Sequence, residues 1–420
     1  GGRVMNPLQE TRWSLLGLWV ALCTIGLIAI YSATQGPVSQ FLPAAVQSTF
    51  SKQVLVIGLS VVIMIIIQFM NPRLIIMLSR IAYPIGILLM IATLWFGKEV
   101  NGAQSWIVLF GFNLQTGEIM KPILIMAAAF YISSQRELSL TKPRHFAIVT
   151  ALFALPIALL LLQNDLGTAL IFIALYPVIL FWSGFPKGVV LLLTIPPLVG
   201  YAALYHWGFG LAIGLVLTAI IFSMQQPRWQ VIASLGIGAV VLVFIQVGLE
   251  AALQPYQVAR IRTFIQPELD PQGAGWNVLQ AKTALGSGGL FGKGFMEGTQ
   301  TQLRYLPEQW TDFIFCVIGE EWGFLGAGLV MITFLGLFWT MLQMMGDQNH
   351  PFSQTVILGF VSVYFFHFLI NIGSSTGLLP VIGVPLPFVS YGGSSMLTNS
   401  IMIAIALNFD RNKRSFSIYR

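Results

Sequence analysis

Long apolar runs separated by short polar connections make up most of the chain. The runs that predict helices are residues 13–33, 52–70, 74–97, 118–134, 146–163, 166–184, 188–206, 208–225, 229–250, 313–342, 353–373 and 394–410. A helix needs about 20 mostly apolar residues to cross a bilayer, and these runs lack the alternation of barrel strands. Backbone groups in lipid must find partners within their own segment, so the pattern predicts an all-α polytopic integral membrane protein. We expect about twelve transmembrane helices, and the tight connections near Asp165 and Gly208 leave ten or eleven open.

Composition excludes a soluble protein. Of the 420 residues, 56% are hydrophobic and 9% charged, whereas a soluble domain carries about a quarter charged residues. We therefore expect a single membrane domain over residues 1–420. The two cysteines and four histidines are scattered and show no metal-ligand spacing.

The basic residues predict the orientation of the helices. If twelve spans are counted, one side of the membrane receives Arg3, Arg12, Arg73, Arg136, Lys142, Arg144, Lys187, Arg228, Arg411, Lys413 and Arg414. Basic residues accumulate on the cytoplasmic side, so both termini are expected to be cytoplasmic. The net charge of +6 is then a feature of topology and not a nucleic-acid surface.

Residues 251–312 form the one long polar segment, and the orientation places this large loop outside the cytoplasm. Within it, residues 275–285 predict a short amphipathic helix that follows a turn at Asp270-Pro271. The glycine-rich stretch 286–294 lacks the Lys-Ser/Thr ending of a phosphate-binding loop, and no strand precedes it. A flexible loop is the better interpretation.

Several ionisable residues lie at the edges of apolar runs, where charge is costly and commonly functional. Glu118 and Lys121 are three apart, so they share a helix face and can pair. Asp165 lies between two runs, and Glu320 and Glu321 enter another. Each also has a structural interpretation, such as a helix N-terminus for Glu118 or an N-cap for Asp165. Together they indicate a hydrated cavity that opens to the outside.

Four stretches resemble the SEDS family of bacterial envelope synthesis. They are "QNDLGTAL" (163–170), "DPQGAGWNVLQAKTALGSGGLFGKGFMEGTQTQL" (270–303), "LPEQWTDFIF" (306–315) and "GLLPVIGVPLPFVSYGGSSML" (377–397). The "GKG" and "GTQ" motifs of the second stretch are more similar to the family member that acts in cell elongation than to the member that acts in cell division. The resemblance implies a peptidoglycan glycosyltransferase that polymerises lipid II at the outer face of the bacterial cytoplasmic (inner) membrane. It also implies a class B penicillin-binding protein, a transpeptidase, as partner.

The resemblance also assigns residues. The essential acidic residue of the family corresponds to Asp270. The family's Gln, Glu and Lys at the start of one span correspond to Gln115, Glu118 and Lys121. Its tryptophan corresponds to Trp106, which here follows Ser105 where the family usually has arginine. The family commonly has ten spans, so residues 208–250 are expected to supply an extra pair.

The reaction can be compared with these residues. One inverting displacement joins an α-linked diphosphate donor to a sugar hydroxyl, and it needs one base within hydrogen-bond reach of that hydroxyl. Asp270 suits this role, and Asp312 is expected to support the cavity. The leaving diphosphate needs cations, for which Lys282 and Lys293 are candidates, with Arg260, Arg262 and Arg304 behind them. A divalent cation such as Mg²⁺ or Mn²⁺ is an alternative, although the sequence shows no protein metal cage.

Two other functions stay open at this point. A lipid II flippase or transporter would also use many spans, embedded charges and broken helices. A scaffold that only positions a transpeptidase would leave Asp270 dispensable. The absence of an obvious internal two-fold repeat and the position of the acidic loop outside the membrane midplane favour the enzyme.

Overall fold

The structure, a computed structural model, describes residues 12–37, 39–100, 102–109, 112–135, 143–252, 255–270 and 275–413. The chain forms two compact units. Unit 1 comprises Gly1–Arg136, Val149–Leu175 and Gln280–Arg420, and unit 2 comprises Glu137–Ile148 and Tyr176–Leu279. The expected single membrane domain over residues 1–420 stays a prediction.

Each predicted apolar run lies on a helix, so the predicted all-α membrane class is confirmed. The helices are α1 (Trp13–Thr34), α3 (Thr49–Phe69), α4 (Pro72–Phe96), α5 (Thr116–Ser134), α6 (Pro143–Leu162), α7 (Leu166–Trp182), α8 (Lys187–Tyr205), α9 (Trp207–Ser223), α10 (Arg228–Val243), α15 (Ile314–Gly346), α16 (Pro351–Thr376) and α17 (Gly393–Arg411). Among the described residues, nine helices are long and apolar enough to cross a membrane. Helices α7 and α9 are apolar but shorter, so the number of spans stays a prediction.

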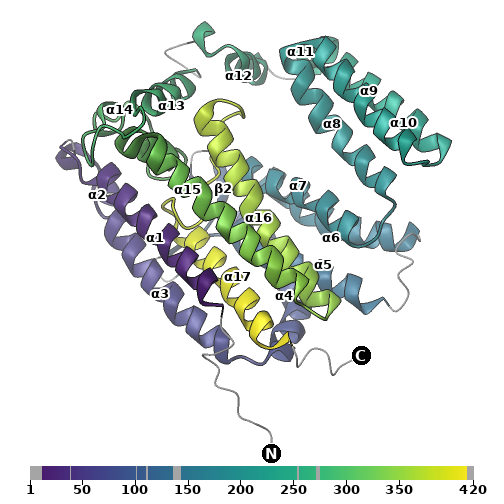
Figure 1. Ribbon diagram of the computed structural model, residues 1–420, viewed down its shortest axis with the longest axis horizontal. Helices are drawn as coiled ribbons and strands as arrows, with labels where there is room; N and C mark the ends of the chain where they lie inside the picture. Colours follow the sequence, from purple (N-terminus) through teal and green to yellow (C-terminus); the bar gives the residue numbers. More distant parts are fainter. Residues whose placement is uncertain are drawn as a thin grey trace, which may run out of the picture. The chain divides into compact units, whose positions relative to one another are not determined.

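In unit 1, α1 packs against α15 and α3, α3 packs against α17, and α5 packs against α4 and α16 (Figure 1). Arg12, which immediately precedes α1, pairs with Asp347 after α15 and with Asp410 near the end of α17. Lys413 is 3.5 Å from the Asp410 carboxylate. The start of α1 and the ends of α15 and α17 therefore meet at one end of unit 1, which we call the basic end.

A three-stranded antiparallel sheet lies between α4 and α5, and the sequence analysis did not predict it. Its strands are β1 (Lys98–Val100), β2 (Ala103–Leu109) and β3 (Phe112–Gln115). Val100 pairs with Ala103, and the sequence between them, Asn101-Gly102, is a strong hairpin signal. Gly102 has φ +83°, which glycine adopts without strain. This signal was available in the sequence.

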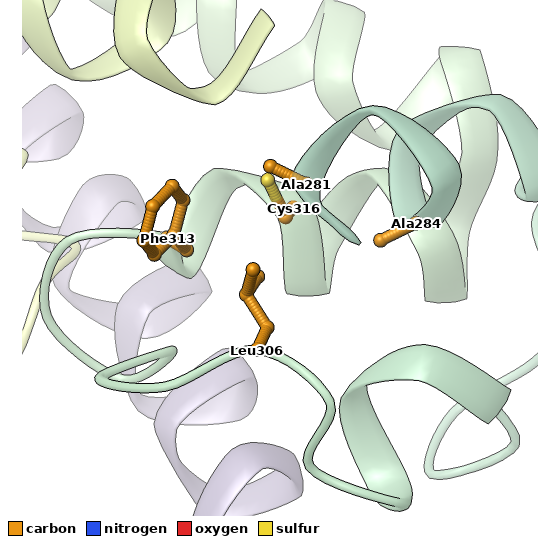
Figure 2. Close-up of a cluster of buried hydrophobic side chains, with 5 residues drawn as sticks. All are labelled: Ala281, Ala284, Leu306, Phe313 and Cys316. Atoms are coloured by element: carbon orange, nitrogen blue, oxygen red, sulfur yellow. The ribbon is translucent and has the colours of Figure 1, made fainter. Parts of the chain in front are cut away.

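The smaller elements lie mainly in the connections. They are η1 (Ser39–Phe41), α2 (Ala44–Gln47), the π-helix η2 (Phe244–Gly248), α11 (Leu249–Ala252), α12 (Pro255–Ile265), the 3₁₀ helix η3 (Pro267–Leu269), α13 (Trp276–Ser287) and α14 (Thr299–Gln302). Helix α13 confirms the helix predicted at 275–285. Its Ala281 and Ala284 pack with Leu306, Phe313 and Cys316, which fixes the second half of α13 to the start of α15 (Figure 2).

Helix α15 is interrupted at Gly323, whose φ of 66° and ψ of −160° are not helical. The glycine-rich loop docks at this interruption. Backbone N–H groups of Phe324 and Leu325 donate to the carbonyls of Gly289 and Leu290, at 2.8 and 3.2 Å. A Cβ on Gly292 would lie 2.1 Å from the carbonyl oxygen of Glu321. The glycines thus permit backbone-to-backbone contact, and two hydrogen bonds join the loop to α15 at the interruption.

Gly323→Ala should destabilise the protein strongly. An added Cβ would lie 2.3 Å from the backbone nitrogen of Gly292, and L residues disfavour this backbone conformation. A residue held in such a region costs about 1–3 kcal/mol before any clash is added. Gly328→Ala in the same helix is the control, because a Cβ there meets nothing within 4 Å. Thermal unfolding of the purified variants in detergent measures the difference, and equal midpoints would contradict this account of the break.

Unit 2 is built on α8, α9 and α10, which pack against one another (Figure 1). Leu192, Ile195, Val199 and Ile221 form the buried centre of this three-helix group. The apolar runs 208–225 and 229–250 lie on α9, α10 and the short helices that follow α10, and their interpretation as a pair beyond the family's ten spans stays a prediction.

Candidate functional site

Polar and charged side chains gather in unit 1 at the starts of α5 and α7. Asp165 caps α7, because its Oδ1 accepts from the backbone N–H of Thr168 at 3.2 Å and its Oδ2 from the Thr168 hydroxyl at 3.0 Å. The Gln115 side chain, which immediately precedes α5, donates to Asp165 Oδ2 at 2.7 Å. The N-cap that the sequence allowed for Asp165 is present, and the same carboxylate joins α7 to α5.

The sheet is attached to the same turn. The carbonyl of Gln163 accepts from the backbone N–H of Gln104 at 2.9 Å, and the Asn164 side chain donates to the Gly102 carbonyl at 2.8 Å. Trp106 is the strand partner of Gln115, so the structure places Trp106 beside the Gln115–Asp165 contact.

Glu118 and Lys121 form a buried ion pair in the first turns of α5. Lys121 Nζ lies 2.6 Å from Glu118 Oε1, and the two side chains are 0% and 2% exposed. The pairing predicted from their spacing is therefore confirmed. Within the part of the chain that the structure describes, Glu118 Oε2 is buried and accepts no hydrogen bond. Such an acceptor carries a desolvation cost unless a further donor reaches it.

His367 on α16 is the second partner of Lys121. Its Nε2 lies 2.6 Å from Lys121 Nζ, and its Nδ1 lies 2.9 Å from the carbonyl oxygen of Pro385. A carbonyl can only accept, so Nδ1 carries the proton and donates it. Nε2 is then free to accept from the ammonium, and His367 is the neutral Nδ1-protonated tautomer.

The non-helical segment 377–392, between α16 and α17, covers this site. Asn371 lies one helical turn after His367 and donates to the carbonyls of Val384 and Asp312, at 2.8 and 3.0 Å. The Ser390 hydroxyl donates to the carbonyl of Thr311 at 2.6 Å. The segment 377–392 is thus fixed to α16 and to residues 311–312 by buried polar contacts.

Asp312 is half-buried beside the segment 377–392. A Cβ added to Gly383 would lie 3.4 Å from Asp312 Oδ2, which shows how closely the two meet. Burial first, and the Glu308 carboxylate second, raise the pKa of Asp312 from 3.8 to about 7. Burial also raises the pKa of Glu308. Asp312 can therefore hold or release a proton near neutral pH.

Asp312→Asn should reduce the dependence of stability on pH. The folded chain keeps a proton on Asp312 that the unfolded chain has lost between about pH 4 and pH 7, so stability falls as the pH rises through this window. Asparagine stays neutral, and this part of the slope should vanish. Thermal midpoints across that range test the effect, with the exposed Glu297→Gln as control. An unchanged slope in Asp312→Asn would contradict the raised pKa.

Lys293 is engaged in an ion pair with Glu320. Its Nζ lies 2.9 Å from Glu320 Oε1. The fully buried Glu320 carboxylate also accepts from the backbone N–H groups of Gln300 and Thr301, each at 2.9 Å. It thereby caps the short helix α14 and fixes the loop that carries Lys293.

Two further residues predicted for the site, Lys282 and Asp270, lie in other parts of the chain. Lys282 is exposed on α13. Asp270 belongs to unit 2, where it is exposed and follows η3. The backbone N–H of Gly275 donates to the Asp270 carbonyl at 3.1 Å, and Pro271 lies outside the described residues. The structure thus brings together Trp106, Gln115, Glu118, Lys121 and Asp165, with Asp312 near by across the segment 377–392.

The described residues show no cluster of metal-ligating side chains. Across the described ranges, no group of three or more His, Cys, Asp or Glu residues could hold a metal ion. The carboxylates of Glu308 and Asp312 interact with each other, but two residues are fewer than the three that such a group requires. The divalent cation considered in the sequence analysis stays a prediction.

His367 and Asn371 were not predicted from the sequence. Histidine was expected only as a metal ligand, whereas His367 is a hydrogen-bond partner of a buried ammonium. The available signal was their spacing, because polar residues four apart share one face of an otherwise apolar helix.

Comparisons with known proteins agree with the fold and the motifs. The family described as cell cycle protein FtsW/RodA/SpoVE matches residues 12–208 and 204–415. The peptidoglycan glycosyltransferase RodA of Treponema pallidum is 32% identical in an alignment of 442 positions that covers 98% of this chain and 99% of that protein. The peptidoglycan glycosyltransferase MrdB of Escherichia coli K12 is 29% identical, with 98% of each chain covered.

Solved structures share the fold. A chain in a peptidoglycan synthase complex, described as coordinating polymerization and crosslinking, superposes with a TM-score of 0.72 at 24% identity, covering 96% of this chain and 98% of that one. The rod shape determining protein RodA of Thermus thermophilus superposes with a TM-score of 0.62 at 22% identity, covering 96% and 97%.

Proposed function

Because the chain belongs to the FtsW/RodA/SpoVE family, we propose that it is a peptidoglycan glycosyltransferase that polymerises lipid II. The observation that carries the proposal is the set of charged residues buried in unit 1, Glu118, Lys121 and Asp165. Buried charge in a membrane protein is costly and marks functional positions.

We place the site on the outer side of the cytoplasmic membrane. Arg12, Arg411 and Lys413 lie at the basic end, which the distribution of basic residues assigns to the cytoplasm together with both termini. The Arg304 side chain donates to the carbonyl of Ala33, near the last residue of α1. Because α1 begins at the basic end, Arg304 and its loop lie at the opposite end.

In the proposed reaction, a sugar hydroxyl of one substrate attacks the anomeric carbon of another and displaces the lipid diphosphate. Asp270 is the proposed general base, because it is exposed and lies in the stretch 270–276 that resembles the family's acidic motif. Lys282 is the better candidate to meet the diphosphate, since it is exposed, whereas Lys293 already pairs with Glu320.

The proposed partner is a class B penicillin-binding protein that crosslinks the peptides of the new strands. The support is the structural neighbour, which is a peptidoglycan synthase complex that combines polymerization and crosslinking. We further propose that the chain acts in cell elongation, on the strength of its RodA and MrdB relatives. Depletion should then give round cells, and filaments with blocked septa would point to division.

Reconstitution in vesicles separates polymerase from flippase. Purified chain and its transpeptidase partner are placed in vesicles with fluorescent lipid II in both leaflets. The proposal predicts glycan strands from lipid II in the leaflet that the loop faces, without transfer between leaflets. Transfer of lipid II between leaflets without strands would reject the enzyme in favour of the transporter.

A further inference from the structure

The buried contacts around Lys121 point to a role for His367 that its apolar sequence context conceals. Lys121 is 0% exposed and His367 1% exposed, so both side chains make these contacts in the interior of the protein. The ammonium donates to Glu118 on its own helix, α5, and to Nε2 of His367 on α16. His367 then donates from Nδ1 to Pro385. One imidazole therefore joins α5 to the segment 377–392.

This segment is central to the site. A Cβ on Gly167, in the first turn of α7, would meet the Val384 side chain at 3.1 Å and the Ile382 carbonyl at 3.5 Å. The Asp312 carboxylate lies close to Gly383, the residue between Ile382 and Val384. A shift of Pro385 would thus move the surroundings of both Asp165, which caps α7, and Asp312.

The imidazole is suited to this position because it offers an acceptor and a donor on opposite sides of one rigid ring. Leucine at position 367 would leave the Pro385 carbonyl without this donor, and Lys121 would keep only Glu118. A buried ammonium that has lost one of two hydrogen-bond partners is expected to shift toward another acceptor, because an unsatisfied buried donor carries a desolvation cost.

We propose that His367 is a positioning residue for the glycosyl-transfer site. Its two hydrogen bonds fix the position of Lys121 relative to the segment 377–392. The inference rests on the proposed function. It assigns His367 no contact with lipid II, so its loss should act on turnover and not on substrate binding. A misplacement of about 1 Å can lower a catalysed rate about 10²-fold.

The test measures kcat and KM for labelled lipid II with the purified complex, together with its thermal midpoint. His367→Leu should lower kcat about 10²-fold with little change in KM. His367→Gln should restore most of the rate, because its amide can accept from Lys121 and donate to Pro385. Tyr364→Phe is the control, since it removes a buried hydrogen bond from α16 to the Asn399 carbonyl but keeps the ring that packs against Phe388 of the segment 377–392. It should keep the wild-type kcat.

Asn371→Ala separates positioning of Lys121 from anchoring of the segment 377–392. It removes the bonds to Val384 and Asp312 but leaves the contacts of Lys121 intact. Losses in kcat that are equal in His367→Leu and Asn371→Ala would overturn the role assigned to His367, as would a wild-type rate in His367→Leu or an inactive His367→Gln. Absence of strands from the wild-type complex would instead reject the proposed function itself.

Discussion

Asp270→Asn is expected to lower the rate of glycan-strand formation by about 10²–10⁴-fold, the usual contribution of a general base. Asparagine has a similar shape but cannot take the proton from the attacking hydroxyl. Because asparagine keeps the size and shape of the side chain, the substitution should leave folding and complex assembly unchanged. Initial rates with labelled lipid II, at equal amounts of assembled complex, measure the effect.

Asp312→Asn is the matched comparison for Asp270→Asn. The pKa of Asp312 is raised to about 7, so its carboxyl also has the acidity that suits a base near neutral pH. Our account gives Asp312 a supporting role, and its substitution should cost less than that of Asp270. The reverse order would transfer the role of base to Asp312.

Lys121→Met should be the most destabilising single substitution in the site. It leaves the Glu118 carboxylate buried without its cation, and breaking a buried ion pair by removing one partner costs about 3–5 kcal/mol. The variant should show a much lower thermal midpoint and yield of folded protein, and with them a loss of activity.

The double variant Glu118→Gln with Lys121→Met tests the cause. Two neutral side chains of similar size leave no unpaired charge, so stability should recover most of what Lys121→Met loses. Additive losses in the double variant would show that the two residues act independently, contrary to the 2.6 Å contact between them.

The spans and the Glu118–Lys121 pair could be predicted from the sequence because both depend on local spacing. Runs of about 20 apolar residues have few alternatives in lipid, and residues three apart on a helix are neighbours. The sheet at 98–115 was not predicted because its strands are short and lie between two long apolar runs, and the Asn101-Gly102 dipeptide is its one strong signal.

The remaining features depend on contacts between distant parts of the chain. Gly323 differs little in sequence context from Gly326 and Gly328, and only its pairing with residues 289–290 identifies it as the break. His367 acquires its role from Lys121, which lies 246 positions away. Asp270 owes its assignment to the family resemblance, since an Asp-Pro dipeptide alone predicts only a turn.

The most direct test of the account is the stoichiometry of the reaction in detergent, where transport between leaflets is impossible. Purified complex is given labelled lipid II, and both the released lipid diphosphate and the joined disaccharides are counted. We predict one diphosphate released for each new glycosidic bond in the wild-type complex, and neither product above background with Asp270→Ala. Strands formed at the wild-type rate by Asp270→Ala, or no strands from the wild-type complex, would contradict the account.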